Sequence, residues 1–340
     1  MAAEMTAARH LGPSDLGLER VARPFARPGW VVVEPYAVGI CGTDAHIHSG
    51  DFPARPPVTL GHEIAGTIVE IGDGIEDFGA GDRVSVEPHL FCTVCSYCRG
   101  GREHLCVDKL AFGVHLDGGM AEAVALPHRT LYRVPDHIPF STAALSEPLA
   151  CSIHGFDRLD PRQGEPLLII GAGPAGLINT ALAVASGTGP VVVVEPGPVR
   201  RRLALEFGAD EVLDATDDDW QEDARALSGG DGFPFVIEAV GSGPTFESAL
   251  ALAARGGRVL AFGAAPVSAT ATVRPYEIFS KELTVLGTVI NPYTQERAVR
   301  MLDRLPLDRL PIASVGLTEV ASAFDGSLRG AVKVQIDTRS

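Results

Sequence analysis

The chain has 340 residues, of which 46% are hydrophobic and 21% charged, a composition typical of a globular protein with a full core. This length predicts two domains, since domains average roughly 100–200 residues. Lysine and arginine number 28 against 43 acidic residues, and the net charge of −15 argues against broad binding to nucleic acids or anionic membranes. No apolar run reaches the roughly 18 residues of a spanning helix, and residues 1–15 lack a signal-peptide core, so we expect a cytoplasmic protein.

Residues 29 to about 135 predict a β-rich domain with irregular loops. The region is rich in Gly, Val and Pro, and its short apolar runs include Trp30–Val33 and Ile64–Ile71. Turn signals such as Asp73-Gly74 and Gly81-Asp82 separate these runs, as expected between successive strands.

Cys41, His62 and Glu63 are candidate metal ligands within this region. Cysteine, histidine and carboxylate side chains all bind zinc, and three protein ligands with one open position make a catalytic site. Taken singly, such a cysteine is more often a core residue, and a His-Glu pair more often lies on the surface. A metal role for these residues therefore depends on the other motifs of the chain.

Four of the six cysteines follow in the spacing Cys-x2-Cys-x2-Cys-x7-Cys, at Cys92, Cys95, Cys98 and Cys106. In a cytoplasmic chain this clustering favours a metal over disulfides. Four thiolates fill the coordination shell of one Zn²⁺, so the site is predicted to be structural. An iron–sulfur cluster is an alternative, although the usual fourth cysteine followed by proline is absent. Buried reduced cysteines without a metal are the remaining alternative.

The pattern changes after about residue 150, where apolar runs of strand length alternate with segments of helical composition. Such alternation predicts a parallel sheet with helical crossovers. The predicted strands are Leu167–Ile170, Val191–Val194, Phe235–Ile237 and Arg258–Phe262, and the predicted helices are Leu177–Ala185, Arg200–Phe207 and Thr245–Ala254. A final strand is predicted at Ala331–Ile336.

A glycine-rich turn between the first of these strands and its helix predicts a dinucleotide site. The turn comprises Gly171, Ala172, Gly173, Pro174, Ala175 and Gly176. Its glycines allow a tight turn and a close approach of pyrophosphate to the helix N-terminus. Glu195 ends the next strand and can bind an adenosine ribose, which favours NAD over NADP. Arg200 lies close enough to bind a phosphate, so NADP stays open, as does a glycine turn without a ligand.

These motifs, in this order, resemble the zinc-containing medium-chain dehydrogenase/reductases, the alcohol and polyol dehydrogenase superfamily. The resemblance covers essentially the whole chain. It implies an α/β protein with a GroES-like, β-rich catalytic domain and a doubly wound Rossmann domain. The catalytic domain is then residues 1–150 completed by 290–340, and the Rossmann NAD-binding domain is 151–289.

The resemblance also implies roles for individual residues. It makes Cys41, His62, Glu63 and Glu147 the residues of a catalytic Zn²⁺ site, with either acid bound directly or through water, and it makes the four clustered cysteines the ligands of a structural Zn²⁺. Cys151 leaves a shifted ligand set open. Asp44 matches the acid that orients a zinc-bound histidine. Thr43 matches the hydroxyl that takes the substrate proton, and His46 matches the next group of the proton relay.

The implied reaction is hydride transfer between a secondary alcohol and NAD. Glu147 and the four-cysteine segment resemble sorbitol-, arabinitol- and threonine-type dehydrogenases, which favours a polyol, sugar alcohol or cyclitol, with Asn291 and Tyr293 as candidate pocket residues. An NADPH-dependent reductase of a sugar or cyclitol ketone is the alternative enzyme. A zinc-ribbon binding module and an inactive scaffold are alternatives of other classes. We expect no nucleic-acid or membrane partner, and the family implies a homo-dimer or homo-tetramer.

Overall fold

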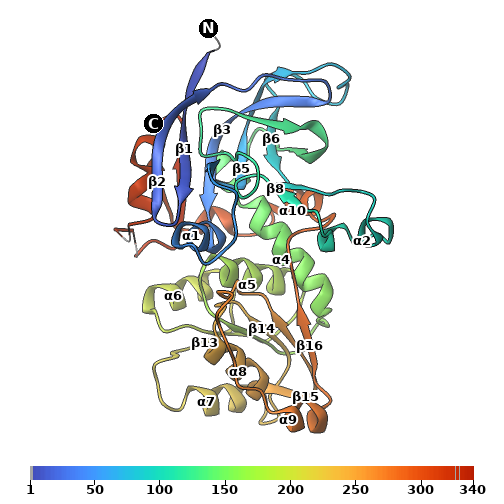
Figure 1. Ribbon diagram of the computed structural model, residues 1–340. Helices are drawn as coiled ribbons and strands as arrows, with labels where there is room; N and C mark the ends of the chain where they lie inside the picture. Colours follow the sequence, from blue (N-terminus) through green and yellow to red (C-terminus); the bar gives the residue numbers. More distant parts are fainter. Residues whose placement is uncertain (1–2, 326, 329) are drawn as a thin grey trace. The chain divides into compact units, whose positions relative to one another are not determined.

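The computed structural model describes residues 3–325, 327–328 and 330–340, which form two compact units. The first, here called the split unit, contains residues 1–150 and 291–340 of the chain. The second, here called the Rossmann unit, contains residues 151–290. Figure 1 shows that the split unit is built mainly from strands and that the Rossmann unit alternates strands with helices.

The split unit is organised around a sheet in which the C-terminal strand pairs with an early one. In the described residues its order is β10-β6-β5-β3-β18-β17, with β9 also paired to β3. The strands are β3 (Trp30–Ile40), β5 (Glu63–Ile71), β6 (Arg83–Val86), β9 (Val124–Pro127), β10 (Leu131–Arg133), β17 (Ile312–Gly316) and β18 (Lys333–Asp337). Two smaller sheets contain β1 (Glu4–Gly12), β2 (Asp15–Ala22) and β4 (Val58–Thr59), and β7 (His89–Leu90) with β8 (Leu110–Ala111).

Short helices and turns connect these strands. They are α1 (Gly42–Ser49), α2 (Ser96–Arg99), η1 (Glu103–Leu105), η2 (His128–Thr130), α3 (Phe140–Ala143), α10 (Gln295–Met301), η3 (Leu307–Arg309) and η4 (Leu317–Ala323). Helix α4 (Ser146–Leu159) begins in the split unit.

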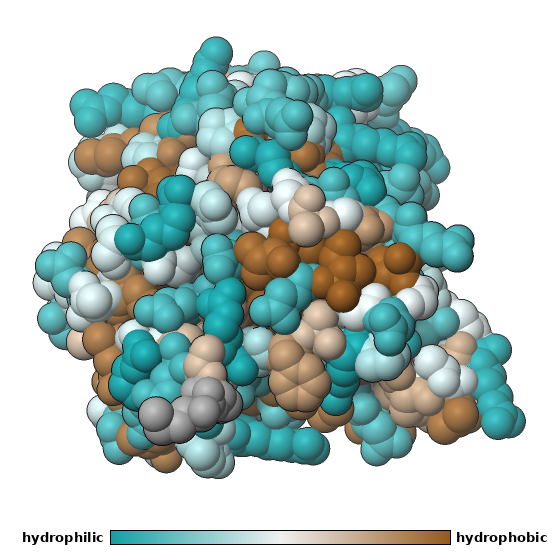
Figure 2. Space-filling model, turned by 90° about the horizontal axis from the view of Figure 1, so that it is seen from above, coloured by the Kyte–Doolittle hydropathy of each residue, from teal (hydrophilic) through white to brown (hydrophobic). Residues whose placement is uncertain are grey.

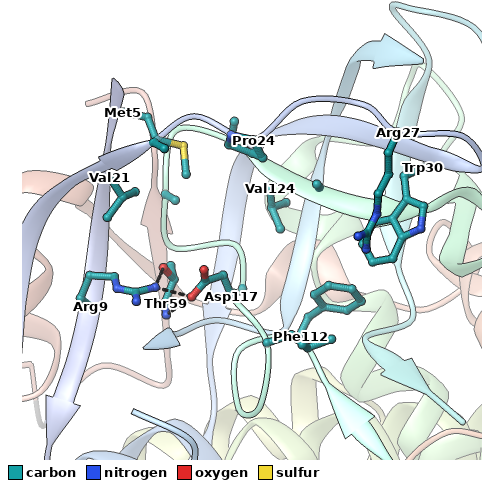
Figure 3. A pocket seen from close by; sticks show the side chains of 16 residues that line it. Met5, Arg9, Val21, Pro24, Arg27, Trp30, Thr59, Phe112, Asp117 and Val124 are labelled. Atoms are coloured by element: carbon teal, nitrogen blue, oxygen red, sulfur yellow. Dashed lines mark hydrogen bonds and ion pairs between the residues drawn. The ribbon is translucent and has the colours of Figure 1, made fainter. Parts of the chain in front are cut away.

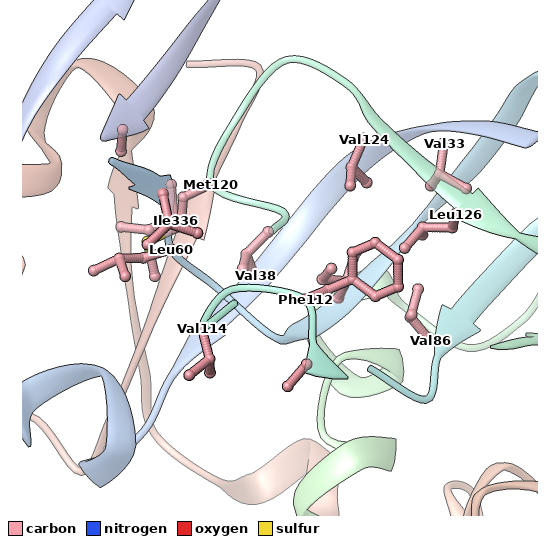
Figure 4. Packing of buried hydrophobic residues seen from close by; sticks show 14 of the residues in the cluster. Val33, Val38, Leu60, Val86, Phe112, Val114, Met120, Val124, Leu126 and Ile336 are labelled. Atoms are coloured by element: carbon pink, nitrogen blue, oxygen red, sulfur yellow. The ribbon is translucent and has the colours of Figure 1, made fainter. Parts of the chain in front are cut away.

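The core of the split unit joins residues far apart in the chain. Val38 of β3, Leu60, Met120 and Ile336 of β18 are all buried in one apolar cluster, and Figure 4 shows their side chains close together. Removing apolar surface from water stabilises this arrangement by roughly 25 cal/mol per Å². The pairing of Val334 with Ile40 therefore brings the start of β18 to the end of β3, where Cys41 follows.

The Rossmann unit contains a parallel sheet of order β13-β12-β11-β14-β15-β16 in the described residues. This is the doubly wound order, in which the strand sequence reverses beside the first strand. The strands are β11 (Leu167–Ile170), β12 (Val191–Val194), β13 (Glu211–Leu213), β14 (Phe233–Glu238), β15 (Ala253–Ala261) and β16 (Thr284–Gly287). The helices are α5 (Pro174–Ala185), α6 (Pro198–Glu206), α7 (Trp220–Leu227), α8 (Gly243–Leu252) and α9 (Pro275–Lys281).

The predicted helix Thr245–Ala254 is shifted in the structure, since α8 covers Gly243–Leu252. Ser242 begins this helix, because its side chain accepts a hydrogen bond from the backbone N–H of Thr245. None of the helices in the described ranges is long and apolar enough to cross a membrane.

Candidate active site and metal centres

The four clustered cysteines converge in the structure around α2 and η1. One sulfur from each of Cys92, Cys95, Cys98 and Cys106 lies within 4.8 Å of the other three, and the Cys92 and Cys98 sulfurs are 3.9 Å apart. A tetrahedral site with Zn–S bonds of about 2.3 Å has sulfurs about 3.8 Å apart. Backbone N–H groups of Cys95 and Cys98 donate to the preceding cysteine sulfurs at 3.3 and 3.5 Å. This donor set and spacing fit one Zn²⁺ with no open position.

The backbone also prepares one of these thiols for metal binding. The N–H of Cys98 is the main cause that lowers the pKa of Cys95 to about 6. A thiolate is the form that binds metal, so the turn favours the ligating state of Cys95 near neutral pH.

Cys41 and His62 meet in the split unit although 21 positions separate them. Cys41 begins α1 directly after β3, and its sulfur accepts a hydrogen bond from the N–H of Thr43 at 3.2 Å. His62 directly precedes β5, which pairs with β3. The Cys41 Sγ and His62 Nε2 atoms are 3.0 Å apart, so both face one point that a metal can occupy.

Asp44 contacts both candidate ligands, Cys41 and His62. Its side chain is fully buried, it accepts a hydrogen bond from the N–H of Cys41 at 3.0 Å, and its other oxygen lies 3.5 Å from His62 Nδ1. A carboxylate at Nδ1 leaves Nε2 free for a metal and sets the ring orientation. Burial lowers the pKa of His62, but Cys41 and Asp44 outweigh burial and raise this pKa well above its ordinary value.

Glu63 lies in a different environment from the predicted ligand position. Both of its oxygens contact the ammonium of Lys333, at 2.6 and 2.7 Å, and Lys333 also donates to the carbonyl of Ile40 at 3.0 Å. A Cβ added at Gly39 would lie only 1.8 Å from Glu63 Oε2, so the strand opposite leaves room for the carboxylate. In the described residues the close ligand group near Cys41 contains Asp44 and His62 and not Glu63. The role of Glu63 as a zinc ligand stays a prediction.

The sequence analysis does not predict the contact between Lys333 and Glu63, because it places Lys333 only within the last strand. The chain contains three lysines, and a lysine within an apolar strand is a signal that a buried acid faces it.

Glu147 lies in the first turn of α4 and is buried. Glu147 does not belong to the close group formed by Cys41, Asp44 and His62 in the described residues, so its zinc role also stays a prediction.

Thr43 and His46 lie three residues apart on α1 and are half-buried. That spacing places both side chains on one face of the helix, as a relay requires.

The predicted pocket residues Asn291 and Tyr293 have different environments in the structure, and their role in a substrate pocket stays a prediction. Asn291 is fully buried and its amide donates to Gln295 at 3.0 Å, which leaves no exposed surface for a substrate. Tyr293 lies with φ at 58° and its hydroxyl bonds to the Glu103 carboxylate of η1. This bond is the main cause that raises the pKa of Tyr293 to about 12.

The glycine-rich turn lies between β11 and α5. Gly173 precedes the helix, Pro174 occupies its first position and Ala175 follows. A Cβ on Gly176 would lie 1.9 Å from the carbonyl oxygen of Gly171, so this close approach requires glycine. The open side of Gly173 has no atom within 4 Å of an added Cβ, which leaves space for a phosphate at the helix N-terminus.

Glu195 is held against this turn by the backbone. Its two oxygens accept hydrogen bonds from the N–H groups of Ala172 at 2.8 Å and Gly197 at 3.0 Å. Arg200 is half-buried on α6, while the next residue, Arg201, forms an ion pair with Asp214 at 2.7 Å. A fixed carboxylate at this strand end suits ribose hydroxyls and repels a 2′-phosphate.

A cavity of about 420 Å³ in the split unit lies away from the candidate ligands. Figure 3 shows Arg9, Thr59 and Asp117 joined by polar contacts at one end and Trp30 with Phe112 at the other. No candidate ligand lines this cavity, so it is distinct from the metal site.

The face seen from above in Figure 2 is largely hydrophilic, with a group of apolar side chains near its middle.

Comparisons with known proteins agree with this geometry. Residues 27–136 match the family described as the alcohol dehydrogenase GroES-like domain, and residues 174–305 match the family described as zinc-binding dehydrogenase. The chain is 38% identical over 274 residues to L-threonine 3-dehydrogenase of Pyrococcus horikoshii, covering 79% of this chain and 78% of that protein.

Solved structures with the same fold span nearly the full chain. One is a protein from Sinorhizobium meliloti 1021 assigned as a zinc-binding dehydrogenase and bound to NADP, with TM-score 0.94, 34% identity and coverage of 98% of this chain and 99% of that one. Another is galactitol-1-phosphate dehydrogenase of Escherichia coli, with TM-score 0.88, 27% identity and coverage of 98% and 100%.

Proposed function

The chain belongs to the zinc-containing medium-chain dehydrogenase/reductases and is an NAD(P)-dependent zinc alcohol dehydrogenase, and from this premise we propose its substrate class and cofactor preference. We propose that it oxidises the secondary alcohol of a small polar molecule, a polyol, sugar alcohol, cyclitol or threonine-like hydroxy amino acid, with NAD. The pair of Cys41 and His62 backed by Asp44 carries this proposal, because it supplies a metal-binding point beside a helix with a hydroxyl and an imidazole.

The residues of the split unit take the following roles in this proposal. Cys41 and His62 hold the catalytic Zn²⁺, which supplies Lewis-acid polarisation of the substrate oxygen when bound. Glu147 is the further acid at this metal. Asp44 keeps His62 in its orientation. The Thr43 hydroxyl receives the alcohol proton and His46 passes it toward solvent, since both lie on one face of α1.

The preference for NAD rests on Glu195. Its carboxylate is 5% exposed and is fixed by two backbone donors, so it does not turn away to make room for a 2′-phosphate. Arg201 forms an ion pair with Asp214, so Arg200, on the same helix, is the candidate arginine for a phosphate. NAD supplies the hydride acceptor, and the chain supplies its position.

We further propose that the protein forms a homo-dimer or homo-tetramer through the open edge of β16. This strand ends the parallel sheet of the described residues, and Val285 on it is 42% exposed, as is Val289 two residues beyond its end. An exposed apolar edge has unpaired backbone donors and acceptors that a second copy of the same strand satisfies around a two-fold axis. The proposed use of clustered cysteines as metal ligands rather than in disulfides fits a reducing cytoplasm.

The test is the absorbance of reduced nicotinamide with purified enzyme, NAD or NADP, and a panel of polyols, cyclitols, L-threonine and simple alcohols. A rate with NAD and one polar secondary alcohol, lost in Cys41→Ala together with one metal ion, supports the proposal. Equal turnover by Cys41→Ala contradicts the assigned site. Reaction only with NADPH and a ketone identifies a reductase instead.

A further inference from the structure

Asn291, Thr294 and Gln295 of the split unit form a buried polar cluster that the reaction scheme does not use. Asn291 and Gln295 are fully buried and Thr294 is 3% exposed. Buried polar side chains are retained in a fold only where hydrogen bonds compensate for the lost water. The direction of those bonds therefore indicates what the cluster holds.

Two hydrogen bonds from this cluster reach the start of α4, one on each side of Glu147 in the chain. The Nε2 atom of Gln295 donates to Ser146 Oγ at 2.9 Å, and the Thr294 hydroxyl donates to the carbonyl of Ala150 at 2.7 Å. Ser146 precedes Glu147 by one position, and Ala150 follows it by three. The helical turn that carries Glu147 is thus held on both sides by neighbouring residues of one segment.

A third contact sets the direction of the Gln295 amide. Asn291 donates to Gln295 Oε1 at 3.0 Å, which leaves the Nε2 end of the amide facing Ser146 and, at 3.4 Å, Ser85 of β6. Ser85 is fully buried and Ser146 is 1% exposed, so water does not replace this donor. Loss of the amide leaves buried groups without a partner, which costs more than the loss of an exposed hydrogen bond.

We propose that Gln295 is a positioning residue for Glu147, acting through Ser146 to fix the first turn of α4. This inference rests on the proposed role of Glu147 at the catalytic metal. A carboxylate near a metal must be held to within about 0.5 Å of its working position. Because a glutamate side chain is flexible, the backbone that carries Glu147 must be rigid. Thr294 fixes the far side of the same turn and Gln295 the near side.

The experiment compares Gln295→Met, Ser146→Ala and a control, Glu296→Gln, all in the full chain loaded with zinc. Methionine has a similar shape and removes both amide donors, while Glu296 is exposed on the same helix. The first readout is amide hydrogen exchange of residues 149–153, which does not require a substrate. Gln295→Met and Ser146→Ala are expected to speed this exchange by at least about tenfold, and Glu296→Gln is expected to leave it unchanged.

The second readout is the rate at which a chelator removes the metal bound by Cys41 and His62. Gln295→Met and Glu147→Gln each speed removal, and the double variant is no faster than Glu147→Gln alone if Gln295 acts through Glu147. The proposal is overturned if the two substitutions multiply in their effect on the rate of metal release. It is also overturned if amide hydrogen exchange of residues 149–153 is unchanged.

Faster exchange in Gln295→Met with no effect of Glu147→Gln on metal release gives a separate result. It supports positioning of the turn by Gln295 and contradicts the metal role of Glu147 in the proposed function. Failure of the positioning role of Gln295 and failure of the metal role of Glu147 are therefore distinguishable without knowing the substrate.

Discussion

The ammonium of Lys333 lies 2.6 Å from Oε2 of Glu63, and the two side chains are 3% and 1% exposed. Burial lowers the pKa of Lys333, but Glu63 and Cys41 outweigh burial and raise it. The pair joins the first residue of β18 to the first residue of β5 and lies next to the candidate metal site. The Lys333 ammonium is therefore a buried positive charge that interacts with Cys41 as well as with the Glu63 carboxylate.

Removing Lys333 is expected to destabilise the fold strongly. Lys333→Met leaves Glu63 as an unpaired buried charge, which costs about 3–5 kcal/mol of unfolding free energy. Glu296→Gln is the matched control, because it breaks an exposed ion pair with Arg300 that contributes at most about 0.5 kcal/mol. Urea unfolding of both variants checks the prediction. Lys333→Met and Glu63→Gln combined should cost less than Lys333→Met alone, and equal losses for Lys333→Met and the control would contradict this account.

Asp44 is expected to contribute to metal affinity through its contact with His62. Asp44→Asn keeps the size of the side chain and weakens the interaction with His62 Nδ1, so the affinity for the catalytic metal should fall roughly 10–100-fold. Competition with a chelator measures this affinity, and the four-cysteine metal serves as the internal reference. An unchanged affinity would show that Asp44 only caps α1.

The four-cysteine site is expected to support local structure before it affects chemistry. Cys98→Ala removes one of four ligands, so the metal of this site should be lost and residues 91–107 should become sensitive to proteolysis. The metal at Cys41 and His62 should remain bound. Metal analysis and limited proteolysis test both statements, and a variant with full metal content and normal resistance would remove Cys98 from the ligand set.

Glu195 is expected to control the choice of nicotinamide cofactor. Glu195→Ser removes the charge that repels a 2′-phosphate, so the ratio of kcat/KM for NADP to that for NAD should rise at least about tenfold. Arg200→Ala in the same background should reverse part of the gain, because Arg200 is the candidate arginine for a 2′-phosphate while the next residue, Arg201, is paired with Asp214. An unchanged ratio in Glu195→Ser would place cofactor discrimination elsewhere.

The Tyr293–Glu103 bond is expected to make stability depend on pH. The Tyr293 hydroxyl lowers the pKa of Glu103 below its ordinary value of 4.5, so the bond stabilises the fold above that value and this contribution is lost as the pH falls through the lowered pKa. Conversely, the pKa of Tyr293 is raised to about 12, so the contribution present below the ordinary value of 10 is lost as the pH rises through 12. Tyr293→Phe should therefore lower stability near neutral pH and match the wild type in acid. A constant difference between the two proteins from neutral to acid pH in urea unfolding would contradict this assignment.

Much of the Rossmann unit could be predicted from local pattern. The predicted strands at 167–170 and 191–194 coincide with β11 and β12, because buried parallel strands are short uninterrupted apolar runs. Boundaries differ where capping decides them: Ser242 caps α8, which therefore begins at Gly243, two residues before the predicted start at Thr245. Pattern alone also gave no reason to bury Asn291, which the structure places against Gln295.

By itself, the sequence determined the sites whose members are close in the chain. The cysteine spacing from 92 to 106 and the glycines from 171 to 176 lie within single turns and loops, where bond geometry limits where the side chains and N–H groups can point. Tertiary structure alone decided which distant groups share a buried charge or hydrogen bond. Glu63 meets Lys333 across 270 positions and Gln295 meets Ser146 across 149, because sheet pairing and core packing bring these segments together. Such contacts depend on how the entire apolar core packs, and no local spacing in the sequence encodes them.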